Sequence, residues 1–317
     1  MHRQRGEVDS TGIAAELTAV IVAVTDGEPR VLTIEHGEAL PSGPFEPGHR
    51  SLQAGLRAWV ETQTRHPLGY VEQLYTFADL DRKKEAHDRA VSVSYLGLTR
   101  EVPVGGGWDA SWTPWYRFFP WEDLRCARPS ISDTILGPPL LDWAASANDP
   151  GTSRARARRI EINFGLAGHR WNEELVLQRY ELLWEAGLVA EAPIHAAPAS
   201  SALQAALGKP MQHDHRRILA TGVARLRAKI KYRPVVFELM PPTFTLLQLQ
   251  RTVEALGGRL LHKQNFRRLI DQQDLVEETG GVTTDTGGRP AKLFRFRGEV
   301  LDERQVSGTK LPLVRAV

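Results

Sequence analysis

The feature that most constrains the fold is a stretch near the C-terminus where two helical patterns precede two strand patterns. Thr245 is a residue type that caps helices, and apolar residues recur at helical spacing after it until the glycines at 257–258, which suit a helix C-cap. A second helical pattern covers residues 263–270. Strand patterns follow at residues 275–279 and 291–296, with a glycine-rich hairpin tip between them. Two helices followed by a hairpin predict a winged helix-turn-helix.

The second of these helices separates apolar from polar side chains. Phe266, Leu269 and Ile270 share one face, which predicts that all three lie in the core. The basic and amide side chains outside that face suit a major groove, and the hairpin suits a minor groove or the DNA backbone. The predicted DNA-binding residues are Lys263, Gln264, Asn265, Arg267 and Arg268 on this helix, Arg289 on the wing, Thr245 at the start of the first helix, and Lys229 and Lys231 just before the winged helix.

Charge is distributed unevenly along the chain. Residues 1–150 carry 14 Lys and Arg against 21 Asp and Glu, a net charge of −7, whereas residues 211–298 carry 16 against 8, a net charge of +8. A basic C-terminal region beside an acidic N-terminal one is typical of a phosphate-binding module joined to another domain. The alternative is that these cations are scattered over an ordinary surface.

Composition sets the outer bounds. A chain of 317 residues is long enough for two domains, and 42% hydrophobic with 25% charged residues is ordinary for a globular protein. The single cysteine, Cys126, excludes a disulfide framework and a multi-cysteine metal site. There is no signal-peptide core, and no apolar run approaches the roughly 18 residues of a membrane span. We therefore expect a cytoplasmic protein that does not enter the membrane.

The N-terminal half alternates between strand and helix patterns. Strands are predicted at residues 17–24, 30–34, 71–77 and 91–98 from their apolar runs and the turns between them. A helix is predicted at residues 51–62, with Ser51 as its N-cap and with Leu52, Leu56, Trp59 and Val60 on its apolar face.

This order of loop, helix and strand, with a glycine ahead of the helix, resembles the Nudix fold. Gly43, Arg57 and Glu61 match the glycine, the arginine and the first late glutamate of the family's box, whereas His49, Ala58 and Thr62 stand where other glutamates belong. The box needs several carboxylates on one helix face to hold divalent cations against a diphosphate. With one of them left, the resemblance implies a domain without a metal site and without catalysis.

A Nudix scaffold without its metal ligands implies a domain that binds a nucleotide and serves as a sensor. NAD⁺, ADP-ribose and ATP all suit a pocket of this ancestry, and a drifted pocket can hold something else, such as a sugar. Four of the candidates have a structural alternative: a loop-capping role for His49, a loop-orienting role for Arg57, and core or interface packing for Trp112 and Trp115. The effector-binding candidates are His49, Arg57 and Glu61 in the box, and Trp112, Trp115 and Arg117 in a tryptophan-rich stretch at residues 105–121.

The segment between the two halves has no catalytic signature. An amphipathic helix is predicted at residues 171–187, ended by Gly187, and a run of arginines precedes it. We interpret this segment as a linker or dimerisation element, and the arginine run as a solvated face rather than a second DNA contact. His213 and His215 are two positions apart and do not share a helix face, which argues against a metal site.

Several motifs in the C-terminal part, in order, resemble those of Nudix-related transcriptional regulators of the NrtR type. They lie at residues 215–219, 226–229, 244–250, 265–268 and 288–296. The length, the middle helices and the eroded box are more similar to the NAD-biosynthesis regulators of the NadQ type. The resemblance implies a homodimeric repressor of NAD-metabolism genes that binds a palindromic double-stranded operator and is released or tightened by a nucleotide effector, with no cofactor required.

The predicted fold class is therefore α+β, in four segments. They are a Nudix-like α/β/α sandwich at residues 13–149, a helical linker at 150–210, a winged helix at 211–298 and a tail at 299–317. The alternative function is a metal-dependent Nudix pyrophosphatase that acts on ADP-ribose or NAD(H) and carries an appended winged helix. That alternative requires carboxylates from outside the box to rebuild the metal site.

Overall fold

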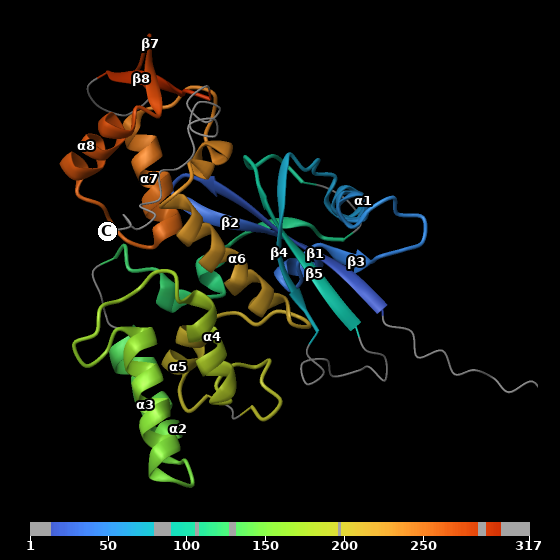
Figure 1. Ribbon diagram of the computed structural model, residues 1–317, viewed down its shortest axis with the longest axis vertical. Helices are drawn as coiled ribbons and strands as arrows, with labels where there is room; N and C mark the ends of the chain where they lie inside the picture. The colour runs from blue at the N-terminus through green and yellow to red at the C-terminus, as the bar shows by residue number, and fades with distance from the viewer. Residues whose placement is uncertain are drawn as a thin grey trace, which may run out of the picture.

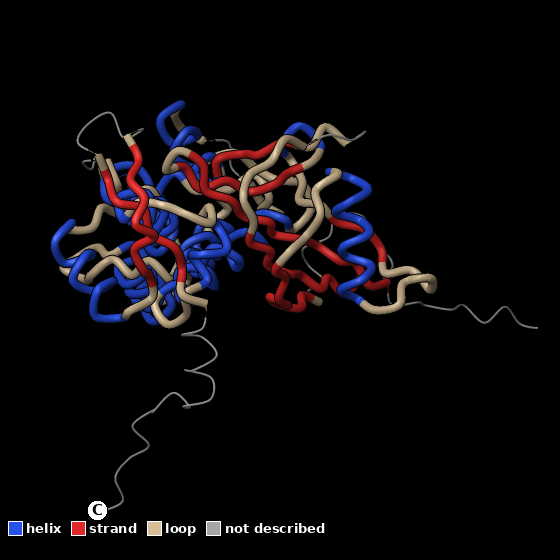
Figure 2. Tube along the Cα trace, turned by 90° about the horizontal axis from the view of Figure 1, so that it is seen from above, coloured by secondary structure: helices blue, strands red, loops and turns tan. Residues whose placement is uncertain are grey.

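The computed structural model describes residues 14–78, 90–104, 108–126, 131–195, 198–284 and 290–298. A mixed sheet lies beside a group of helices, and a two-stranded hairpin forms one end of the long axis (Figure 1). Seen from above, most of the helices lie with the hairpin on one side and most strands of the large sheet on the other (Figure 2).

The large sheet has six strands in the order β4-β5-β1-β2-β6, with β3 also paired to β1. β1 runs parallel to β5, and every other pair is antiparallel. The predicted strands of the N-terminal half are therefore confirmed. The strands are β1 (Ala14–Thr25), β2 (Glu28–Thr33), β3 (Ser42–Pro44), β4 (Tyr70–Phe77), β5 (Ala90–Leu98) and β6 (Ser111–Pro114).

One face of this sheet is covered by α1 (Leu52–Thr64). Leu56 and Val60 of the helix form a buried cluster with Leu17 and Ile21 of β1. The predicted cap is confirmed, because the Ser51 hydroxyl accepts a hydrogen bond from the Ala54 amide at 3.1 Å.

The opposite face is covered by α6 (His215–Ile230), which lies beyond the middle helices in sequence. Val20 and Val22 of β1 pack in the cluster that contains Leu219 and Val223 of α6. The approach is close at Gly222, where a Cβ atom would lie 2.9 Å from Val20. An α/β/α sandwich is thus present, and α6 supplies its third layer (Figure 1). This helix lies beyond the predicted bounds of 13–149, in the segment that the sequence assigned to the winged helix.

The middle of the chain is helical. α4 ends near Gly187, which has a φ of +70°, as the glycine stop predicted. The helix begins later than predicted, because residues 171–175 form turns before it. The helices and short helical segments here are η5 (Ile131–Leu136), α2 (Gly137–Ala145), α3 (Pro150–Phe164), α4 (Val176–Glu185) and α5 (Ser201–Leu207).

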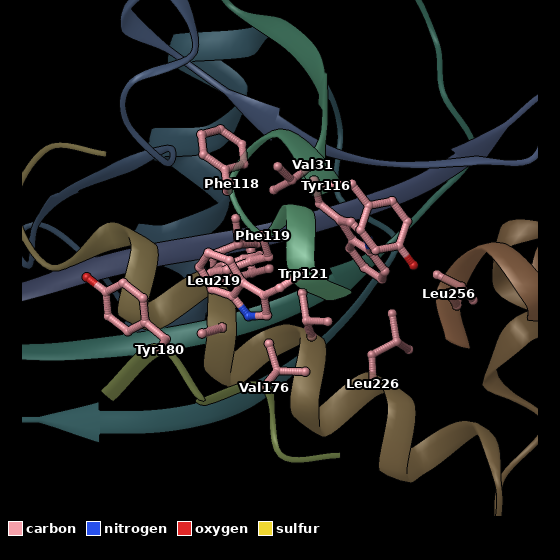
Figure 3. Close-up of a cluster of buried hydrophobic side chains, with 14 of the residues drawn as sticks. Val31, Tyr116, Phe118, Phe119, Trp121, Val176, Tyr180, Leu219, Leu226 and Leu256 are labelled. Carbon is pink, nitrogen blue, oxygen red and sulfur yellow. The ribbon is translucent and has the colours of Figure 1, made fainter. Parts of the chain in front are cut away.

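The sheet, the middle helices and the C-terminal domain share one hydrophobic core (Figure 3). Aromatic side chains from η3 (Trp115–Arg117), η4 (Pro120–Glu122) and the residues between them fill its centre. Tyr180 of α4, Leu219 of α6 and Leu256 of α7 (Leu246–Gly257) surround them. Trp115 and Trp121 of the tryptophan-rich stretch therefore pack in the core, which was one of its two predicted roles, whereas Trp108 is exposed and Trp112 is half-buried.

The C-terminal domain has the predicted order of two helices and a hairpin. Gly258 ends α7 with a φ of +70°. The first hairpin strand is longer than predicted, because it continues through the glycines to Thr283, with a register shift between Glu278 and Val282. The elements around α7 are η6 (Val235–Leu239), α8 (Lys263–Gln273), β7 (Val276–Thr283) and β8 (Ala291–Phe296).

Candidate functional site: a nucleic-acid interface and an effector domain

The exposed face of α8 carries a dense set of polar groups. Phe266 and Ile270 are buried beneath it, as predicted. Leu269 is 51% exposed, so its predicted place in the core is wrong. Phe266 and Ile270 lie four residues apart on the face of α8 that packs against the core, and Leu269 lies beside that face. The described structure contains no ion pair that engages the cations of this face. The exposed predicted residues are Lys263, Gln264, Asn265, Arg267 and Arg268.

The hairpin wing is held against the helices at its base. Phe244 and Phe294 exchange two backbone hydrogen bonds at 2.9 and 2.8 Å, and Phe237 stacks on Phe296 with ring centroids 4.2 Å apart. Lys292 pairs with Glu278 across the strands at 2.8 Å. Arg289, the predicted wing contact, lies outside the described residues.

Thr245 is a helix cap and is closed to DNA. Its side chain is 2% exposed, and its hydroxyl accepts a hydrogen bond from the Gln248 amide at 3.2 Å. The Gln248 side chain in turn accepts from the Thr245 amide at 2.7 Å, which completes a capping box. The prediction of a DNA contact by this side chain is wrong, because burial and the cap occupy it.

Lys229 and Lys231 are also engaged within the protein. The Lys229 ammonium contacts the Glu72 carboxylate of β4 and donates to the Tyr70 hydroxyl at 2.7 Å. Lys231 lies 2.9 Å from Glu173 and 2.6 Å from Glu174. These ammonium groups tie α6 to the sheet and to the segment before α4. The predicted phosphate contact of Lys229 is wrong, because its side chain is 12% exposed and engaged, whereas Lys231 is 39% exposed and its contact stays a prediction.

The ion-pair partners at the two ends of these contacts shift the pKa values of Glu72 and Lys231. Partial burial would raise the pKa of Glu72, but hydrogen bonds from Lys229 and Tyr70 hold it below its ordinary value. Burial would lower the pKa of Lys231, but its two carboxylate partners raise it. Both shifts favour the charged forms and therefore the ion pairs.

A buried ion triad joins three parts of the chain. The Glu122 carboxylate in η4 accepts from Arg179 of α4 and from Arg227 of α6, each at 2.5 Å, and all three side chains are fully buried. Arg227 also donates to the Leu256 carbonyl of α7 at 2.8 Å. Burial would raise the pKa of Glu122, but the two guanidinium charges hold it below its ordinary value.

Sequence reasoning missed this triad. Its signal is a charged residue inside an otherwise apolar pattern: Glu122 follows a run of aromatic residues, and Arg179 and Arg227 interrupt amphipathic helices. A charge in such a position is buried only if it is paired, which points to a partner but does not identify it.

The effector-binding candidates are not gathered into one site. Arg57 of α1 donates to the carbonyls of Leu68 and Gly69, so it has the loop-orienting role that was its structural alternative. Trp115 is 1% exposed and lies in the core on the opposite face of the sheet, so its predicted ligand contact is wrong. Glu61 and Arg117 are exposed.

The other two candidates have structural partners and remain partly accessible. The His49 Nδ1 atom accepts a hydrogen bond from the Glu46 amide at 3.0 Å, which is the predicted loop-capping role. The Trp112 indole donates to the Val102 carbonyl at 2.9 Å. Over the described ranges, no group of three or more His, Cys, Asp or Glu residues is arranged to hold a metal ion, and no helix has the length and apolarity to cross a membrane.

Comparison with known proteins identifies the C-terminal domain. Residues 236–296 match the family model of the NrtR DNA-binding winged helix domain. The ADPR responsive transcriptional repressor NtrR of Acinetobacter baylyi is 40% identical over 94 residues, which are 30% of this chain and 37% of the relative. The chain thus matches well under half the length of that curated relative.

Two solved structures share the overall fold. The NrtR of Shewanella oneidensis, crystallised with a 27mer DNA, is 20% identical, with 89% of this chain and 93% of that one covered at a TM-score of 0.53. A MutT/nudix family protein from Enterococcus faecalis is 15% identical, with 93% and 90% covered at a TM-score of 0.52. A Nudix-like domain followed by a winged helix is therefore the fold of this chain.

Proposed function

We propose that this chain, an NrtR-type winged helix joined to a Nudix-like domain, is a cytoplasmic transcriptional repressor that responds to a nucleotide. The observation that carries the proposal is the outer face of α8, where Lys263, Arg267 and Arg268 are exposed without an ion pair in the described structure. Cations held free of internal partners are available for phosphates and base edges.

In the proposed complex, α8 enters the major groove of double-stranded DNA. Arg267 and Arg268 bond guanine edges or phosphates, and Asn265 bonds an adenine edge or a phosphate. Arg289 on the wing contacts the minor groove. A homodimer would present two copies of α8 to a palindromic operator, with half-sites about 34 Å apart.

The proposed effector is ADP-ribose, with NAD⁺ and ATP as alternatives of the same chemical class. The support is the Acinetobacter baylyi relative, which is an ADPR responsive repressor. Of the box carboxylates, Glu61 remains, whereas Ala58 and Thr62 have no charge. We therefore propose binding without hydrolysis, and genes of NAD biosynthesis as targets.

The test is operator binding by the full-length protein, using duplexes selected from a random pool. We expect the logarithm of the binding constant to fall linearly with the logarithm of salt concentration, and ADP-ribose to change the affinity. Linkage then requires DNA to change the affinity for ADP-ribose by the same factor. If no duplex is selected from the pool, the proposal that this chain is a repressor is contradicted. Mg²⁺-dependent turnover of ADP-ribose that is abolished by Glu61→Gln would instead support the pyrophosphatase.

A further inference from the structure

A cleft of about 150 Å³ lies where the effector domain meets the start of α6. Trp59, Gly43 and Trp108 line it from the effector domain, and His213 and His215 line it from the segment that leads into α6. None of the six effector-binding candidates from the sequence is among its lining residues, but Gly43 of the predicted box and Trp59 of the box helix α1 are. The cleft therefore borders the box without including the residues predicted to bind the effector.

Two indole rings line the cleft, and they differ in their contacts within the protein. The Trp59 indole donates to the Pro44 carbonyl at 2.9 Å and packs against Gly43, where a Cβ atom would lie 2.4 Å from the ring. Trp59 is therefore fixed. Trp108 is 42% exposed, and the described contact it makes is through its backbone carbonyl, which accepts from the Glu35 amide at 2.8 Å. Its ring is available to a ligand.

The backbone around the cleft is strained. Glu35 and His213 line it with φ values of 53° and 52°, and the neighbouring His36 has a φ of 57°. Residues with a Cβ atom adopt this left-handed region at an energetic cost, and such residues gather at ligand sites where the surrounding structure holds them.

The two sides of the cleft are tied to each other. The Leu40 amide donates to the Nδ1 atom of His215 at 3.0 Å, and the Gln212 amide donates to the Glu38 carbonyl at 2.8 Å. The Lys209 ammonium donates to the His36 carbonyl at 3.1 Å. A ligand between these segments would contact both ends of the connection.

α6 carries that connection to the DNA-binding domain. The helix starts at His215 beside the cleft, and near its other end Arg227 bonds Glu122 and the Leu256 carbonyl of α7. A displacement at the start of this packed helix would therefore reach α7 through the Arg227 contacts.

We propose that this cleft binds the heteroaromatic ring of the nucleotide effector, stacked on Trp108, and that occupancy shifts the start of α6 and thereby the winged helix. The inference rests on the proposed function and adds the place and the route of regulation. Adenine and nicotinamide share the planar, polarisable face that an indole stacks on.

The test is calorimetric titration of the full-length protein and its Trp108→Ala variant. ADP-ribose offers adenine alone, nicotinamide mononucleotide offers nicotinamide alone, and NAD⁺ offers both, so the ligand that binds identifies the ring. Loss of one base–aromatic stack is expected to weaken binding by about tenfold. The ligand concentration that produces half of the maximal change in operator affinity should rise by the same factor.

The matched control is Tyr75→Ala, which removes an exposed aromatic ring of β4 outside the cleft and should leave the affinity unchanged. Thermal melting of both variants shows that they are folded. Equal ligand affinity in wild type and folded Trp108→Ala would contradict ligand binding in the cleft, but not the proposed repressor function. If no nucleotide binds the wild type while operator binding is intact, both the cleft and the nucleotide effector fail, and the DNA-binding assignment survives.

Discussion

Two basic helices of this protein use their cations in opposite ways. On α6, Arg227 is buried against Glu122, Arg217 pairs with Glu181, and Lys229 pairs with Glu72. On α8, the Lys and Arg side chains are exposed, with no ion pair in the described part of the chain. The cations of α6 stabilise the fold through ion pairs, whereas those of α8 are exposed to solvent.

The difference explains the charge asymmetry of the sequence. Part of the positive excess at residues 211–298 neutralises acidic groups of the preceding parts of the chain, such as Glu72 and Glu122. A basic region is therefore an indicator of DNA binding only for those cations that have no acidic partner in the fold. Lys229 was wrongly assigned for this reason.

The largest effect should come from removing the acid that α6 uses. Glu122→Ala would leave Arg179 and Arg227 buried without a carboxylate, and we expect the free energy of unfolding to fall by about 3–5 kcal/mol. Denaturant unfolding measures the change. Glu122→Gln, which keeps the shape and one acceptor oxygen, should cost less. An unchanged denaturation midpoint in Glu122→Ala would show that the triad is not closed to water.

The opposite result is expected on α8. Arg267→Ala combined with Arg268→Ala should weaken operator binding by roughly 10- to 100-fold. The salt slope, which is the slope of the logarithm of the binding constant against the logarithm of salt concentration, should become shallower by about 1 to 2. The free energy of unfolding should stay within about 0.5 kcal/mol of wild type, because both side chains are exposed.

Fluorescence anisotropy with a selected duplex measures the affinity of the α8 variant. Arg158→Ala, an exposed cation on α3, is the matched control, and it should bind DNA like wild type. Full operator affinity in the double variant would remove α8 from the interface.

The smallest effect is predicted for Lys229→Met, which breaks the pair with Glu72. The free energy of unfolding should fall by about 1 kcal/mol at neutral pH, while the salt slope of DNA binding stays unchanged. The folded-state pKa of Glu72 is lowered, so the pair stabilises the fold above the ordinary carboxyl pKa of 4.5, and that contribution is lost as pH falls through the folded-state value.

The difference between wild type and Lys229→Met should therefore shrink in acid, which unfolding curves between pH 7 and pH 3 can follow. A difference that is constant with pH would mean that packing of the lysine stem, rather than its charge, stabilises the junction.

Local signals predicted most of the architecture. The caps at Ser51 and Thr245 and the stop at Gly258 were recognisable because each acts within a few residues of its position. The α8 surface followed from helical spacing, although one apolar residue too many, Leu269, was assigned to the core. Spacing identifies the side on which a residue lies, but not how far the neighbouring elements reach over it.

Long-range pairing was beyond these signals. Lys229 meets Glu72 across 157 positions of sequence, and Arg227 meets Glu122 across 105. The sequence around one partner does not identify the other, since an exposed lysine near a helix end has the same neighbours whether or not it forms an ion pair. For the same reason, the cleft beside Trp108 was not predicted, because segments far apart in sequence form it.

The position of α6 as the third layer of the sandwich has a consequence for synthesis of the chain. β1 emerges from the ribosome long before residues 215–230, so the apolar face that carries Val20 and Val22 waits uncovered while the middle helices are made. A fragment that stops at residue 149 would keep that face bare permanently. We expect such a fragment to aggregate.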